Sequence, residues 1–130
     1  MKILIQSAQI VCPQSPFHLK KKNVVINNGR ITDIFDKNTA ADKIIDADGM
    51  LLSAGWVDVG AAVGDPGTEH REDLTSLVRA AAAGGFTDVA VLPNTQPTVQ
   101  TKNEVSYLTQ GNASRLVQVH ALAAITRGCK

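Results

Sequence analysis

The second half of the chain alternates apolar strands with amphipathic helices, and this order constrains the fold more than any other feature. Residues 56–59 predict a short strand, residues 86–92 a nearly continuous apolar strand, and residues 116–122 a third strand. Continuous apolar strands are typical of a parallel sheet that is covered on both faces. The pattern therefore favours parallel pairing here over hairpins.

Two helices are expected between these strands. Five apolar residues have the spacing of one helical face, namely Leu74, Leu77, Val78, Ala81 and Ala82. We expect this helix to end at Gly84-Gly85, because glycine favours the conformation that closes a helix. Residues 101–104 (TKNE) have the pattern of a capping box, which predicts a second helix that ends near Gly111. The order strand, helix, strand, helix, strand predicts an α/β fold with right-handed crossovers.

The first half of the chain predicts a small antiparallel β domain. Asn28-Gly29 separates the apolar segments 23–27 and 30–35, and this dipeptide is a strong signal for a hairpin turn. Further short strands are expected at residues 2–5, 9–11, 44–46 and 50–52.

The change of pattern near Ala54 predicts a domain boundary. In this interpretation residues 1–53 form the small β domain and residues 54–130 begin a larger α/β domain. Three parallel strands and two helices leave apolar edges uncovered, whereas a closed (β/α)₈ barrel takes roughly 250 residues. We therefore expect the chain to be the leading piece of a longer polypeptide.

Composition excludes several classes of partner. The 130 residues include 13 Lys+Arg and 12 Asp+Glu, a formal net charge of +1, so no attraction to nucleic acid or to an anionic membrane is expected. The basic cluster of His18 and Lys20–Lys22 lacks interleaved aromatic residues and is interpreted as a solvated loop.

Targeting signals are not found in the sequence. No apolar run approaches the roughly 18 residues that span a bilayer, and the N-terminus lacks the pattern of a signal peptide. A cytoplasmic protein is therefore expected, with Cys12 and Cys129 as reduced thiols. A long-range disulfide between these two cysteines is the alternative.

Several motifs, taken together, resemble those of dihydroorotases in the cyclic-amidohydrolase group. They are Gly55-Trp56-Val57-Asp58, Asp65-Pro66-Gly67, Glu72-Asp73, residues 81–87 (AAAGGFT), residues 93–97 (PNTQP) and residues 124–128 (AITRG). Each motif alone is a weak signal, but their order and spacing are fairly specific. The resemblance covers the whole chain, including the hairpin at Asn28-Gly29.

The resemblance implies a small β domain followed by a metal-dependent (β/α)₈ TIM barrel, of which this chain would contain the first three strands. Such enzymes normally hold zinc and reversibly open the cyclic amide of dihydroorotate in pyrimidine synthesis. Their first barrel strand ends in Asp-x-His-x-His, and both imidazoles reach one metal because strand residues two apart point to the same face. The metal lowers the pKa of a bound water and polarises the amide carbonyl.

The chain departs from this pattern at the metal site. Asp58 is kept, but Gly60 and Ala62 stand where the two histidines are expected, and neither offers a lone pair. Gly64 stands where the family usually carries an arginine that binds the substrate carboxylate. We therefore predict no metal ligand, no catalytic residue and no bound cofactor in this chain. Asn94 matches the family's asparagine that helps to bind the substrate carboxylate, and it is the predicted substrate-binding residue; a turn residue is the alternative.

Two histidines remain as alternative metal ligands, and neither is favoured. His70 lies among acidic residues at a predicted helix entrance, where the helix dipole explains the acidic groups. His120 lies in the third predicted strand and shares a face with Gln118 and Leu122. We interpret it as a strand histidine with a polar partner.

These residues predict a dihydroorotase-like homologue that does not catalyse the reaction. The resemblance includes non-catalytic members that act as structural partners of aspartate carbamoyltransferase, so this partner or self-association is expected. The alternative is an active hydrolase of a cyclic amide with an altered metal site, in which Asp58, Asp65 or His70 would activate water. A third interpretation is an α/β fragment whose function lies elsewhere in a longer chain.

Overall fold

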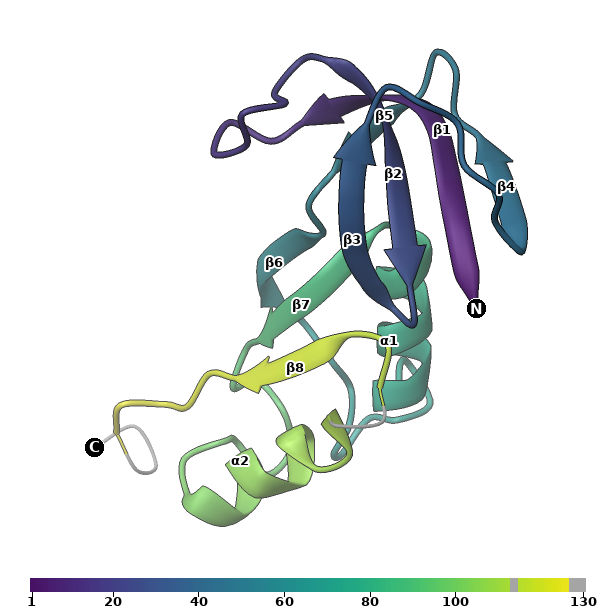
Figure 1. Cartoon of the computed structure of the whole chain (residues 1–130). Coiled ribbons are helices and arrows are strands. Elements are labelled where there is room, and N and C mark those ends of the chain that lie inside the picture. The colour runs from purple at the N-terminus through teal and green to yellow at the C-terminus, as the bar shows by residue number, and fades with distance from the viewer. Residues whose placement is uncertain (113–114, 127–130) are drawn as a thin grey trace. The chain divides into compact units, whose positions relative to one another are not determined.

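The computed structural model describes residues 1–112 and 115–126, which fold into two compact units, Met1–Ala54 and Gly55–Lys130 (Figure 1). The first unit contains β1 (Lys2–Val11), β2 (Lys21–Asn27), β3 (Arg30–Phe35), β4 (Lys43–Asp46) and β5 (Leu51–Ser53). The second contains β6 (Trp56–Ala61), α1 (Leu74–Ala83), β7 (Phe86–Val91), α2 (Lys102–Thr109) and β8 (Gln118–Ala121). Cys129 and the last two residues of the AITRG motif, Arg127 and Gly128, lie outside the described residues.

The sheet of the first unit has the order β3-β2-β1-β4, with β5 also paired to β1. The predicted hairpin is confirmed, because β2 and β3 pair in antiparallel fashion around Asn28 (φ 49°) and Gly29 (φ 78°). The expectation of a wholly antiparallel domain is wrong, since β4 and β5 both run parallel to β1. The sheet is therefore mixed.

One long strand, β1, replaces the two short strands that were expected at residues 2–5 and 9–11. Its pairing with β2 is irregular between Ile5 and Ala8, where Ser7 has a φ of 62°. The buried side chain of Asn23 accepts the Ser7 N–H at 2.8 Å and so satisfies a donor that the irregular ladder leaves out.

The basic cluster is only in part the loop that was expected: His18 and Lys20 precede β2, whereas Lys21 and Lys22 belong to it. The Lys21 ammonium pairs with the carboxylate of Asp48. The Lys22 ammonium lies 2.6 Å from an oxygen of Asp36 and 5.8 Å from the ring centroid of Phe17. These lysines therefore have partners within the small domain itself.

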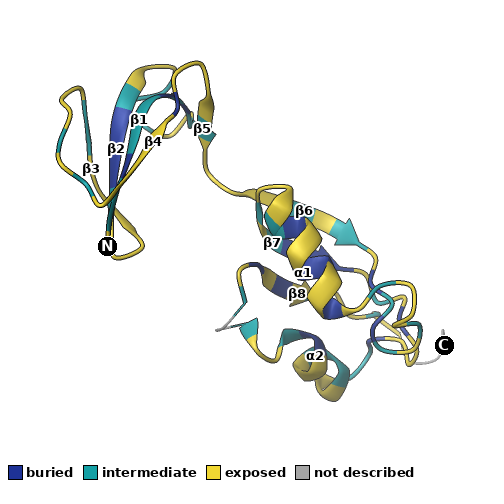
Figure 2. Ribbon diagram, turned by 90° about the vertical axis from the view of Figure 1, so that its right-hand side faces the viewer, coloured by how far each residue is buried: buried dark blue, intermediate teal, exposed yellow. Residues whose placement is uncertain are grey.

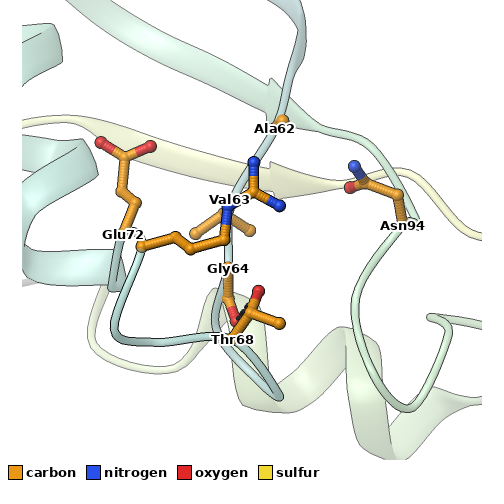
Figure 3. Close-up of a pocket in the computed structure, with 7 residues that line it drawn as sticks. Ala62, Val63, Gly64, Thr68, Glu72 and Asn94 are labelled. Carbon is orange, nitrogen blue, oxygen red and sulfur yellow. Dashed lines mark hydrogen bonds between the residues drawn. The ribbon is translucent and has the colours of Figure 1, made fainter.

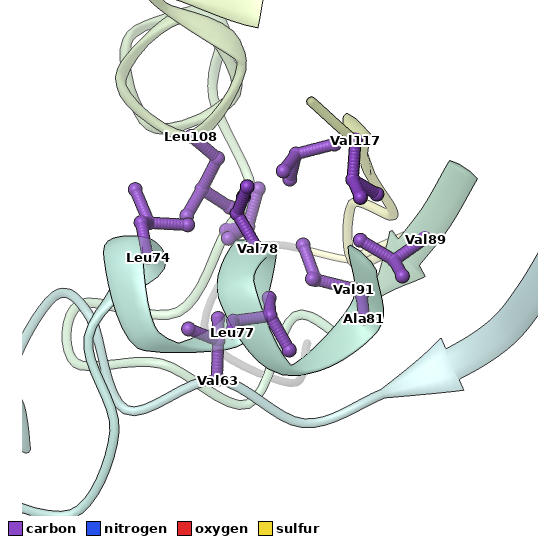
Figure 4. Packing of buried hydrophobic residues seen from close by; sticks show 11 residues of the cluster. Val63, Leu74, Leu77, Val78, Ala81, Val89, Val91, Leu108 and Val117 are labelled. Carbon is purple, nitrogen blue, oxygen red and sulfur yellow. The ribbon is translucent and has the colours of Figure 1, made fainter. Parts of the chain in front are cut away.

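The sheet of the second unit is parallel throughout, in the order β6-β7-β8, and α1 and α2 form its two crossovers. Both helices contribute to one buried cluster on the same face of this sheet (Figures 2 and 4). Its members include Val63, Leu74, Leu77, Val78, Val89, Val91, Leu108, Val117 and Val119. Placing both helices on one face is the arrangement of a barrel wall, whereas a doubly wound sheet carries helices on both faces.

Local signals explain the ends of both helices. At the start of α1, the Asp73 carboxylate accepts the Ser76 N–H at 2.7 Å, and the Ser76 hydroxyl accepts the Asp73 N–H at 3.1 Å. The helix ends as predicted, at Gly84 followed by Gly85 with a φ of 81°. The predicted capping box of α2 is also present, because the Glu104 carboxylate accepts the N–H of its N-cap residue Thr101 at 2.7 Å.

Within the described residues, neither helix is long and apolar enough to cross a membrane.

Candidate functional site

A polar cavity of about 240 Å³ opens where β6 and β7 end (Figure 3). It is lined by Ala62, Val63, Gly64, Thr68, Arg71, Glu72 and Asn94. Ala62 directly follows β6, and Asn94 lies in the loop after β7. Because ligands of parallel α/β sheets bind at the carboxyl ends of the strands, this cavity is the candidate functional site of the second unit.

The loop after β6 folds back onto Gly64. The Gly64 N–H donates to the Glu72 carbonyl at 3.0 Å, and the Gly64 carbonyl accepts the Thr68 N–H at 2.6 Å. A Cβ atom at position 64 would lie 2.3 Å from the carbonyl oxygen of Thr68 and 2.8 Å from that of Glu72. Since both oxygens belong to the backbone, position 64 has no room for any side chain.

Gly60 shows a different restriction. A Cβ atom there would meet no atom within 4 Å, so space is available. Its φ is +113°, however, in a region where side chains of L-amino acids are strained. The backbone at this position therefore suits glycine and disfavours histidine, for a conformational reason and not a steric one.

A zinc ion does not fit the residues of this site. Gly60 has no side chain and Ala62 ends in a methyl group, so neither can donate an electron pair to a metal. In the described parts of the chain, no group of three or more His, Cys, Asp or Glu side chains is placed to hold a metal ion.

Asp65 is a buried residue of the loop between β6 and α1, and it already has two partners. Its Oδ1 atom accepts the Tyr107 hydroxyl at 2.6 Å, and its Oδ2 atom accepts the Leu74 N–H at 3.4 Å. This bond to Asp65 is the main reason why the pKa of Tyr107 lies above its usual value. Asp65 therefore links α1 and α2 to the loop and does not line the cavity.

The other two candidate water activators also lie outside the cavity lining. Asp58 is in register with Val89, a residue of the buried cluster. His70 is exposed. Its neighbour Glu69 has a lowered pKa, chiefly because its carboxylate accepts the Gly67 N–H at 2.8 Å.

His120 has a polar partner, as the sequence indicated. Its Nε2 atom lies 2.8 Å from Oδ1 of Asp88, whose Oδ2 atom accepts the Thr87 hydroxyl at 2.9 Å. The hydrogen bond to His120 is the largest cause of the lowered pKa of Asp88. Asp88 and His120 alternate along their strands with the buried Val89 and Val119, so they lie on the sheet face opposite the helices.

Asn94, the predicted substrate-binding residue, lies on the wall of the cavity. It is exposed, and Figure 3 shows its side-chain amide pointing toward the segment that contains Ala62 and Val63. Arg71 lines the same cavity, and sequence analysis did not identify it. Its spacing from other residues in the sequence does not predict this position, because Arg71 reaches the cavity only when the loop folds back onto Gly64.

Comparisons of sequence agree with the motifs. No protein-family model matches the chain. Proteins named dihydroorotase do match it: that of Geobacter sulfurreducens is 35% identical over 134 residues, covering 100% of this chain and 31% of the relative. The dihydroorotase of Syntrophotalea carbinolica is 39% identical over 132 residues, again with 100% of this chain and 31% of the relative covered. The chain thus spans about a third of the length of these curated relatives.

Solved structures show the same fold at lower sequence identity. An L-hydantoinase (dihydropyrimidinase) from Arthrobacter aurescens superposes with a TM-score of 0.76 at 20% identity, covering 97% of this chain and 28% of that one. A D-hydantoinase gives a TM-score of 0.69 at 21% identity, with the same coverage of 97% and 28%. The predicted fold is therefore confirmed, a small β domain followed by parallel strands with crossover helices. Over its whole length the chain is similar in sequence to dihydroorotases, and it shares the fold of the matching part of these two hydantoinases.

Proposed function

We propose that the chain belongs to a dihydroorotase-like protein of pyrimidine biosynthesis that has kept the amidohydrolase framework without its hydrolytic chemistry. The observation that carries this proposal is the identity of the residues at positions 60, 62 and 64, at and just beyond the end of the first parallel strand. Gly60 and Ala62 offer no metal ligand, and position 64 has no room for a side chain that could bind an anion.

Loss of these groups removes the usual means of opening a cyclic amide. Water is a weak nucleophile at neutral pH unless a metal or a base activates it, and a carboxylate base alone typically supplies only about 10²–10⁴-fold. Asp65, the buried carboxylate nearest the site, is already hydrogen-bonded to Tyr107 and to the N–H of Leu74. A non-catalytic role is the function that this geometry supports best.

The second part of the proposal is a structural role. By resemblance to non-catalytic members of the family, the protein assembles with aspartate carbamoyltransferase, or with itself, in the cytoplasm. Asn94 is proposed to keep its contact with a bound ligand, because its side chain still lines the cavity at the strand ends. The alternative function, an active cyclic-amide hydrolase with an altered metal site, would need ligands outside the described residues.

Metal content and activity, measured together, test the non-catalytic part. The purified protein is analysed for zinc, and hydrolysis of dihydroorotate is followed with and without added zinc. We expect substoichiometric zinc and no turnover. Zinc at one equivalent with measurable turnover would overturn the non-catalytic proposal and favour the alternative function.

Assembly is tested separately, by size-exclusion chromatography of the protein alone and mixed with the aspartate carbamoyltransferase of the same cell. Co-elution with the carbamoyltransferase supports the proposed partner, and a concentration-dependent increase in mass of the protein alone supports self-association. A monomer in both experiments would contradict the structural role.

A further inference from the structure

We propose that Asn28-Gly29, the turn between β2 and β3, is a site of spontaneous deamidation. This site lies in the small β domain, so it is independent of the proposed function. Asn28 is the one asparagine of the chain that is followed by glycine. Because glycine has no side chain to shield its own backbone nitrogen, that nitrogen can approach the side-chain amide of the preceding asparagine.

The reaction needs only water as its second reactant. Solvent base takes the proton of the Gly29 backbone nitrogen, this nitrogen bonds to Cγ of Asn28, and the bond from Cγ to Nδ2 breaks as ammonia leaves. The product is a five-membered succinimide ring. Water then opens the ring at one of its two carbonyl groups. Opening at Cγ gives aspartate, whereas opening at the backbone carbonyl carbon gives isoaspartate, in which the main chain runs through Cβ and Cγ.

The turn is open to this reaction. Asn28 and Gly29 are both exposed, and a Cβ atom at Gly29 would meet no atom within 4 Å, so the turn has room to move while the ring forms. The Met1 ammonium donates to Oδ1 of Asn28 at 3.0 Å, and Figure 1 shows the start of β1 beside this turn. A positive charge at this oxygen withdraws electrons from Cγ and favours attack by the nitrogen.

A second turn, Asp48-Gly49, has a similar backbone and gives an internal comparison. Gly49 has a φ of 76°, against 78° for Gly29, and its Cβ atom would also meet no atom within 4 Å. The Asp48 carboxylate is paired with Lys21, and the hydrogen bond from this lysine is the main reason why the pKa of Asp48 lies below its usual value. Because an ionised carboxylate resists attack by a nitrogen, Asn28 is the more reactive of the two positions.

The two products have different effects on the hairpin. Two residue pairs, Ile26–Ile31 and Asn27–Arg30, lie between the turn and the irregularity of the β2–β3 ladder. Aspartate keeps the backbone unchanged and makes the contact with the Met1 ammonium a charge-assisted one. Isoaspartate lengthens the main chain of a two-residue turn whose geometry matches the twist of its strands. The two residue pairs next to the turn should therefore be lost in the isoaspartate form.

Storage of the purified protein at mildly alkaline pH, followed by peptide mass spectrometry, tests the proposal. Deamidation raises the mass of the affected peptide by one mass unit, and labelling by an isoaspartyl methyltransferase detects isoaspartate. Asn103, an exposed asparagine of α2 that is followed by glutamate, is the reference. We expect Asn28 to be converted at least about tenfold faster than Asn103, because its activation barrier is lower. No isoaspartate is expected at Asp48.

Two glycine substitutions form a matched pair. Gly29→Ala and Gly49→Ala both place a Cβ atom in open space at nearly the same positive φ. Gly29→Ala should slow the conversion of Asn28 at least about tenfold, because the added methyl group hinders the attacking nitrogen and raises the barrier. Gly49→Ala should leave this rate unchanged. Circular dichroism of each variant verifies that it is folded.

Hydrogen exchange of the separated products gives an independent readout. The backbone amides of residues 26–31 should exchange faster in the isoaspartate form than in the unmodified protein, and no faster in the aspartate form. Three results would overturn the proposal: conversion of Asn28 no faster than that of Asn103, equal slowing by the two glycine substitutions, or unchanged exchange of the hairpin amides in the isoaspartate form.

Discussion

The hydroxyl of Tyr107 donates a 2.6 Å hydrogen bond to Oδ1 of Asp65, a contact between residues 42 positions apart in the sequence. Tyr107 belongs to α2, and Asp65 lies in the loop that carries Gly64 and Arg71 to the cavity. The Asp65 side chain is buried, and its other contact, with the Leu74 N–H, is long at 3.4 Å. The tyrosine is therefore the main partner of this carboxylate and helps to hold the loop of the candidate site.

Tyr107→Phe removes this partner and leaves a buried carboxylate with one long hydrogen bond. We expect the free energy of unfolding to fall by about 1–3 kcal/mol, the usual cost of leaving a buried polar group unsatisfied. Urea denaturation measures the change, with Ser106→Ala at the preceding exposed position of α2 as the control. Equal stability of the two variants would show that the contact contributes nothing.

The titration of Tyr107 gives a second test, because it is the single tyrosine of the chain. Its hydrogen bond to Asp65 raises its pKa above the ordinary value of 10.0. A raised pKa in the folded state means that the stabilisation is fully present below pH 10 and is lost as the pH rises through the folded pKa. The tyrosinate absorbance should therefore have its midpoint above pH 10.0, and Asp65→Asn should move it down. A wild-type midpoint at or below 10.0 would contradict this contact.

Local patterns in the sequence predicted the elements of the second unit well. The five apolar residues of α1 begin with Leu74 and are buried or half-buried in the structure, and the helix ends at Gly84 as expected. The capping box at Thr101 is also present. Each of these features depends on residues about one helical turn apart in the sequence, so the local sequence is sufficient to predict it.

Contacts between distant segments were predicted less well. Nothing near Lys43 or Leu51 in the sequence indicates that β4 and β5 run parallel to β1, because that pairing depends on the path of the whole small domain. Arg71 was missed for the same reason. The sequence shows that Gly64 replaces an arginine of the family pattern, but only the folded loop shows that the carbonyl groups of Thr68 and Glu72 fill the space.

Gly64→Ala tests whether position 64 is closed by its backbone neighbours. Its Cβ would lie 2.3 Å from the Thr68 carbonyl oxygen, so the loop must shift, and we expect a loss of about 3 kcal/mol, at the upper end of overpacking costs. Gly85→Ala is the control, because its Cβ would meet its nearest neighbour, Trp56 Cδ1, at an ordinary 3.7 Å. Its positive φ alone should cost about 1–2 kcal/mol. A smaller loss at Gly64 than at Gly85 would contradict the close approach.

Restoring the two histidines of the family pattern should not restore a metal site. Gly60→His places an L-residue at a φ of +113°, which we expect to cost about 1–3 kcal/mol even though the space is open. Ala62→His, at an exposed position, should be tolerated and serves as the control. Thermal unfolding and zinc titration of the single and double variants measure both effects. Tight zinc binding by the double variant at undiminished stability would show that the backbone still accommodates the site.

The pair of Asp88 and His120 should be visible in the titration of the carboxyl group. His120 lowers the pKa of Asp88 below 3.8, so the pair stabilises the fold above that pH, and this contribution is lost as the pH falls through the folded pKa. His120→Ala should therefore raise the pKa of Asp88, measured by NMR of its carboxyl carbon, whereas Gln118→Ala on the same strand should leave it unchanged. The Thr87 hydroxyl also bonds Asp88, so part of the shift should persist without the imidazole. Because the pair is partly exposed, added salt should reduce the pKa shift of Asp88 in the wild type. If neither added salt nor His120→Ala changed the pKa of Asp88, the shift would be due to Thr87 alone.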